Sequence, residues 1–152
     1  MFLELTSVDL VPLLWMSNFT IACMLFGLIL VIQFVHYPSF RWVDENKFVD
    51  FEHFHSRSIS FIVLPLMVLE LVIAISLLFT IIDFYIFIYA NLVSIMLIWL
   101  STFLLSVPCH NALMNGKDDA VITKLIKTNW IRTILWGIRV VSLFYVLFME
   151  LD

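Results

Sequence analysis

The chain has 152 residues, of which 63% are hydrophobic and 13% charged, and its formal net charge is −4. Soluble domains contain roughly 45–50% apolar and about 25% charged residues, so this composition excludes an ordinary soluble domain and indicates a membrane protein. No run of basic residues indicates a nucleic-acid partner. The partner that the composition predicts is the lipid bilayer.

Four stretches are long and apolar enough to cross a bilayer, which takes about 20 residues each. They cover approximately residues 11–36, 58–82, 84–107 and 129–149. Together they predict an all-α, polytopic membrane protein, in which residues 1–152 form one antiparallel four-transmembrane-helix bundle. The connection at Asp83 is so short that the second and third spans must form a hairpin.

Each of the two longer connections contains a predicted short interfacial helix. In the first, Phe48, Phe51 and His55 recur at helical spacing, which is typical of an amphipathic segment at the membrane surface that runs into the second span. In the second, an Asn-Gly turn precedes a helix that begins at about Asp118.

The basic residues predict the orientation of the bundle. They lie in or beside the two longer connections: Arg41, Lys47, Arg57, Lys117, Lys124 and Lys127. The positive-inside rule makes this face cytoplasmic. The predicted localisation is therefore integral and multi-pass, with both termini on the non-cytoplasmic side.

Five large aromatic residues lie near the predicted span ends: Trp15, Tyr37, Trp42, Tyr85 and Trp130. Tryptophan and tyrosine are enriched where a membrane meets water. These five residues are predicted to form an aromatic belt that anchors the bundle.

Two charges, Glu70 and Arg139, lie deep in the predicted spans. From the cytoplasmic face Glu70 is about 19 Å along its helix and Arg139 about 15 Å, which places both near the bilayer midplane. An isolated charge is costly there, so the two residues are predicted to form a bidentate intramembrane ion pair. The pair has two open interpretations, a device that fixes helix register and the polar floor of a ligand cavity.

A stripe of polar and aromatic side chains runs along the last span. Asn129, Arg132, Trp136 and Arg139 follow at helical steps and fall within one arc of roughly 80°. The alternating topology brings the shallow part of this stripe to the same face as the histidines at the ends of the other spans. The side chains predicted to ring a pocket mouth there are Gln33, His36, His55, His110, Asn111, Asn129 and Arg132.

A transition-metal site is one interpretation of this pocket. His36, His55 and His110 come from three helices, and imidazoles can bind zinc, iron or copper with a carboxylate such as Glu52 nearby. The spacing shows no metal-binding motif beyond the pair His53 and His55. The alternative is a basic mouth in which Arg132 holds an anionic headgroup or carboxylate.

Two short segments resemble a known group of proteins. The end of the third span, from Ser101-Thr102 to Pro108-Cys109-His110-Asn111-Ala112-Leu113, and the start of the fourth, NWIRTILWGIR, are similar to the anthrone-oxygenase-like families of small four-helix integral membrane proteins. The resemblance singles out Asn111, Trp130 and Arg132. It implies oxygenation of polycyclic aromatic substrates, although most members have no assigned activity.

The sequence therefore supports two functional hypotheses, with transport a third. In the first, the protein binds or oxidatively transforms a hydrophobic small molecule or lipid. His36, His55 or His110 would act as base or metal ligand, and Arg132 would stabilise negative charge on an oxygen. The other ligand contacts would come from Gln33, Asn111, Asn129, Trp130 and Trp136. In the second, the chain is a non-catalytic accessory or assembly subunit, with a second copy or a larger membrane complex as partner.

Overall fold

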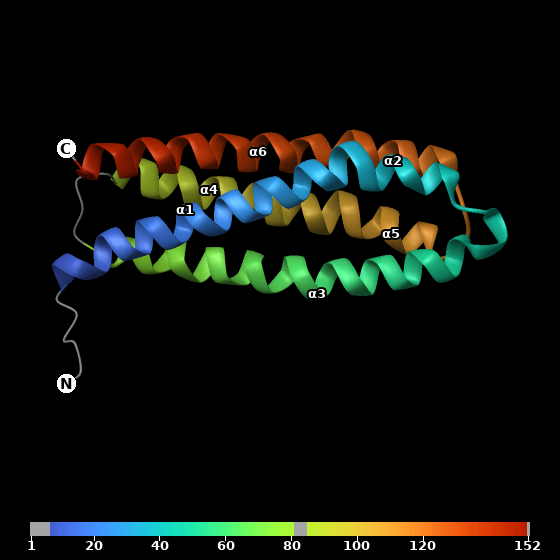
Figure 1. The fold of residues 1–152 in the computed structure, drawn as a ribbon, viewed down its shortest axis with the longest axis horizontal. Helices are drawn as coiled ribbons and strands as arrows, with labels where there is room; N and C mark the ends of the chain where they lie inside the picture. Colours follow the sequence, from blue (N-terminus) through green and yellow to red (C-terminus); the bar gives the residue numbers. More distant parts are fainter. Residues whose placement is uncertain (1–6, 81–84, 152) are drawn as a thin grey trace.

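The computed structural model describes residues 7–80 and 85–151, in which nearly every residue is helical and no strand occurs. Four long helical segments lie alongside one another as an antiparallel bundle (Figure 1). The start of the first segment and the end of the last lie at one end of the bundle. The two basic connections lie at the other, which we call the basic-loop end. This arrangement confirms the predicted fold class.

The first and third segments share an irregularity. Helix α1 (Ser7–Val31) continues through a π-helical turn, η1 (Ile32–His36), into the short helix α2 (Tyr37–Ser39) and the 3₁₀ turn η2 (Phe40–Trp42). Helix α4 (Tyr85–Ser101) likewise continues through a π-helical turn, η3 (Thr102–Ser106), into α5 (Val107–Leu113).

A proline follows each π-helical turn and explains its place. Pro38 and Pro108 lack the N–H that an α-helix needs, and their rings crowd the carbonyl one turn earlier. The backbone N–H of Tyr37 bonds to the oxygen of Ile32, five residues back, as a π-helix requires. The extra residue in each turn rotates the side chains that follow it relative to those before it.

The second and fourth segments are single helices, α3 (Glu45–Leu78) and α6 (Asp119–Leu151). Each begins at an aspartate that caps its first turn. Asp44 accepts a hydrogen bond from the backbone N–H of Asn46, and Asp118 accepts one from that of Ala120. The two predicted interfacial helices are therefore not separate elements, because each is the first part of a long helix. In the turn before α6, Gly116 has a φ of 152°, which favours glycine.

By length and composition, four segments can cross a membrane: Leu10–Trp42, Glu45–Leu78, Tyr85–Leu113 and Asp119–Met149. They extend beyond the predicted spans because the helices continue into the connections. The predicted turn at Asp83 lies outside the described residues. Large apolar side chains such as Phe61 and Val141 point outward and are 83% and 70% exposed, as lipid-facing residues would be. The chain is thus a multi-pass integral membrane protein.

The predicted aromatic belt is only partly correct. Trp42, Tyr85 and Trp130 are exposed, but Trp15 and Tyr37 are buried inside the bundle. Tyr37 faces inward because it directly follows the π-helical turn η1, whose extra residue changes the direction of the side chains after it.

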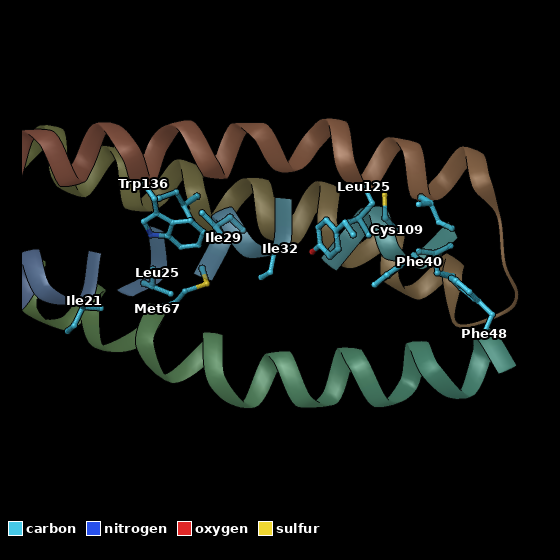
Figure 2. Packing of buried hydrophobic residues seen from close by; sticks show 14 residues of the cluster. Ile21, Leu25, Ile29, Ile32, Phe40, Phe48, Met67, Cys109, Leu125 and Trp136 are labelled. Atoms are coloured by element: carbon cyan, nitrogen blue, oxygen red, sulfur yellow. The ribbon is translucent and has the colours of Figure 1, made fainter. Parts of the chain in front are cut away.

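Buried apolar side chains fill the bundle in two clusters. The larger one extends from the middle of the bundle to the basic-loop end, where it includes Phe40, Phe48 and Cys109 (Figure 2). Leu25, Met67 and Trp136 lie together toward the middle of the bundle, and Ile21 lies beyond them at the far end of the cluster (Figure 2). The second cluster includes Trp15, Leu77 and Leu143.

Candidate functional site

A cavity of about 260 Å³ lies inside the half of the bundle nearer the basic-loop end, and all four helical segments line it. Small-molecule sites usually have volumes of about 300–1,000 Å³, so this cavity suits a small ligand. Its walls are mainly aliphatic and aromatic. The residues that line it include Tyr37, Val63, Leu64, Met67, Trp99, Phe103, Ser106, Val107, His110, Arg132 and Trp136.

The two sides of the cavity differ in exposure. Met67 and Trp136 are buried within the bundle. By contrast, Leu64 on α3, Phe103 on η3 and Val107 on α5 line the cavity and are exposed on the lipid-facing surface. The cavity therefore borders the bilayer between α3 and the α4–α5 segment.

A chain of hydrogen bonds begins among the cavity's lining side chains. An Nη2 hydrogen of Arg132 is donated to the hydroxyl oxygen of Tyr37 across 3.2 Å. The same hydroxyl lies 3.1 Å from Nε2 of His110, and Nδ1 of His110 lies 2.6 Å from Oε1 of Glu52. Glu52 is fully buried and also accepts a hydrogen bond from the Ser56 hydroxyl. The chain thus links α6, α2, α5 and α3.

The Glu52 carboxylate at one end of this chain can only accept hydrogen bonds, and the Arg132 guanidinium at the other can only donate them. Nδ1 of His110 therefore carries the hydrogen that bonds to Glu52. When the imidazole is neutral, its Nε2 is an acceptor, and the Tyr37 hydroxyl then donates to it. The Tyr37 oxygen in turn accepts from Arg132.

A second branch fixes Arg132 from the other side. Nη2 of Arg132 also bonds to the side-chain oxygen of Asn129. Asn129 donates to Oε1 of Gln33 across 2.8 Å, and Gln33 donates to the backbone oxygen of Ile126. Gln33 and Asn129 are buried but do not line the cavity. They hold the guanidinium in place.

Three side chains that line the cavity keep a polar atom without a hydrogen-bond partner: Nε of Arg132, Oγ of Ser106 and Nε1 of Trp99. A buried polar group without a partner costs about 1–3 kcal/mol. A bound molecule with hydrogen-bonding oxygens would recover part of this free energy.

His36 and His55 form a hydrogen-bonded pair that lies beside His110. Nε2 of His36 lies 2.7 Å from Nδ1 of His55, and the ring centroids of His55 and His110 are 5.3 Å apart. Neither His36 nor His55 lines the cavity, so of the predicted histidines only His110 does. His36 and His55 pack against the rings of Phe40 and Phe51.

The metal interpretation finds no support in this geometry. Within residues 7–80 and 85–151, no three His, Cys, Asp or Glu side chains are placed to hold a metal ion. Both ring nitrogens of His110 are engaged, with Glu52 and Tyr37, and His36 and His55 bond to each other.

Two residues that the resemblance singles out lie on the outside. Asn111 is exposed, and its backbone oxygen accepts a hydrogen bond from the Asn115 side chain. Trp130 is exposed and contacts Phe34 edge to face. Neither lines the cavity. Trp130 precedes the cavity-lining Arg132 by two residues, about 200° around the helix, so it lies on the opposite face of α6.

Glu70 and Arg139 form an ion pair in the interior, next to the cavity. The pair is not bidentate, because a single guanidinium nitrogen, Nη1, contacts Glu70. The Nε and Nη2 groups of Arg139 donate instead to Asn91 and Asn18, across 2.9 and 3.2 Å. Trp136, which lines the cavity, donates to Glu70.

Several members of these networks were not predicted in these roles. Tyr37 was assigned to the membrane interface, Glu52 was considered only as a metal ligand, and Asn18 was not considered. Pro38, which follows Tyr37 directly, was the available signal for a local change of side-chain direction.

The chain matches no family model, no curated protein and no solved structure. The chemistry of the cavity therefore carries the functional argument.

Proposed function

We propose that this membrane protein binds a small hydrophobic molecule in the cavity between its four helical segments. The molecule would have an apolar body and at least one oxygen that accepts hydrogen bonds. Arg132 would hold this oxygen, and the ligand would come from the bilayer. The observation that carries the proposal is a buried guanidinium, Arg132, in the wall of a mainly apolar cavity, with its Nε hydrogen unpartnered.

Charge and burial both support Arg132 as the anchor. The residue is 6% exposed, and within residues 7–80 and 85–151 it has no carboxylate partner, since it bonds to Tyr37 and Asn129. A buried cation bonded only to neutral groups favours an anionic or strongly polar oxygen nearby. The apolar walls would bind the rest of the ligand through burial of its surface.

The exposed rim supports entry from the lipid. Leu64, Phe103 and Val107 connect the cavity lining to the bilayer-facing surface, so a molecule dissolved in the membrane need not pass through water. The oxygenase activity that the resemblance implies stays a prediction.

Equilibrium dialysis of 2-naphthoate against the protein in lipid nanodiscs tests the proposal, with empty nanodiscs as the partition blank. Arg132→Gln removes the charge, and Arg57→Gln makes the same substitution at an exposed arginine outside the cavity. A charge-assisted hydrogen bond contributes about 1.5–3 kcal/mol, so Arg132→Gln is expected to weaken binding about ten- to hundredfold. Arg57→Gln should bind as the wild type does.

Two outcomes would contradict the proposal: uptake by the wild type that does not exceed the blank, and equal binding by both variants. If Arg132→Gln lowered thermal stability and left naphthoate binding unchanged, the accessory-subunit hypothesis would be favoured instead. Naphthalene, which has no oxygen, is the neutral comparison and should bind the wild type and Arg132→Gln equally.

A further inference from the structure

The chain of hydrogen bonds behind the cavity has the order needed to move a proton. Tyr37 and His110 line the cavity, and Glu52 lies behind them, fully buried. The Tyr37 hydroxyl is 3.1 Å from Nε2 of His110, and Nδ1 of that imidazole is 2.6 Å from the carboxylate. A neutral imidazole that bonds to a carboxylate through one nitrogen becomes a stronger proton acceptor at the other.

We infer that Tyr37, His110 and Glu52 form a proton relay that ionises a bound ligand, which makes the ligand an apolar molecule with a weakly acidic hydroxyl group. This inference rests on the proposed binding function and specifies its ligand class. In the step, the ligand O–H bond breaks and its proton passes to the Tyr37 oxygen. Tyr37 gives its own proton to Nε2 of His110, and the ligand oxyanion pairs with Arg132.

The step conserves charge inside the bundle. Before it, Arg132 and Glu52 carry opposite charges and the ligand and His110 are neutral. After it, the oxyanion lies beside Arg132 and the imidazolium beside Glu52, so each new charge has an opposite neighbour. Weak dielectric screening in the interior strengthens both attractions. His55, whose ring centroid is 5.3 Å from that of His110, and His36 behind it are the other titratable groups on this side.

The position of the unpaired atoms is consistent with this ligand class. Arg132 keeps its Nε hydrogen free and Ser106 keeps its hydroxyl free, so both can donate to an oxyanion. General acid–base residues act when they lie within hydrogen-bond reach of the proton that they transfer. Tyr37 is the member of the relay that contacts both Arg132 and His110.

The test uses 4-nitrophenol, which is yellow when ionised, bound to the protein in nanodiscs at a pH where the free probe is mostly neutral. Dialysis gives the amount bound, and the absorption spectrum gives the ionised fraction of the bound probe. The variants are His110→Gln, which removes the proton acceptor, and Glu52→Gln, which removes its counter-charge. His53→Gln, at an exposed histidine of the same helix as Glu52, is the matched control.

The inference predicts ionised bound probe in the wild type and His53→Gln. At saturating probe, it predicts an ionised-to-neutral ratio at least about tenfold lower in His110→Gln and Glu52→Gln, equivalent to about one pKa unit of the probe, with the amount bound little changed. Neutral bound probe in the wild type, or equal ionisation in His110→Gln, would overturn the relay and leave the binding function intact. Absence of binding to the wild type would overturn both. If His110→Gln does not fold, Tyr37→Phe replaces it, because the phenol is the hydrogen-bonded link between His110 and Arg132.

Discussion

Replacing Arg139 with methionine should be among the most damaging single substitutions in this protein. The guanidinium is 1% exposed and bonds to Glu70, Asn91 and Asn18. Without it, Glu70 would keep one contact to its Oε2, from Trp136 at 3.4 Å, while its Oε1 already has no partner.

The expected cost follows from this loss of partners. Removing one member of a buried ion pair costs about 3–5 kcal/mol, because the remaining charge stays in a poorly solvating environment. The double variant Glu70→Leu/Arg139→Met removes both charges. It should be at least about 2 kcal/mol more stable than Arg139→Met alone, since replacing a whole buried pair by apolar residues is often close to neutral.

Equilibrium unfolding in mixed detergent micelles, followed by circular dichroism, measures the free energy of unfolding of Arg139→Met and of the double variant. Val141→Met, on the exposed side of the same helix, is the control and should change stability by no more than about 0.5 kcal/mol. The reasoning is refuted if Arg139→Met costs less than about 1 kcal/mol, or if the double variant is no more stable than that single variant.

Three further predictions concern the cavity, the glycines and the connections. Val63→Phe should fill the cavity and abolish 2-naphthoate uptake in dialysis, while Val68→Phe, exposed on the same helix, leaves it unchanged. Gly27→Ala should raise the free energy of unfolding in detergent by about 0.5–1 kcal/mol, since the added Cβ meets no atom within 4 Å. Gly116→Ala, at a φ of 152°, should lower it by at least about 1 kcal/mol. Lys117→Met should cost about 1 kcal/mol in the same assay, because its ammonium donates to two carbonyls of the first connection across 2.8 Å each.

The fold was predictable because it follows from properties that the sequence displays directly. Long apolar stretches and their polar boundaries specify four helices and an antiparallel order. Equal depth was enough to pair Glu70 with Arg139, since two isolated charges near a bilayer midplane are both costly. The pair's detailed geometry was not predictable, because Asn18 and Asn91 reach it from other helices and take two of the three guanidinium nitrogens.

The candidate site was predictable on α6 and less so elsewhere. Asn129, Arg132 and Trp136 share one face of an uninterrupted helix, so their common direction follows from helical periodicity. Tyr37 and the residues after Pro108 follow π-helical turns, where the assumed period of 3.6 residues fails. The partners of His110 also depend on how α3 and α5 pack, which periodicity within one helix does not specify.

The most direct test of ligand binding in the cavity is photolabelling with 4-benzoylbenzoate, an apolar carboxylate that reacts readily with methionine. Met67 lines the cavity and is 2% exposed, whereas Met24 and Met96 face outward. The account predicts labelling of Met67 in nanodiscs, suppressed by excess 2-naphthoate and strongly reduced in Arg132→Gln. Labelling of Met24 and Met96 with Met67 untouched would contradict it.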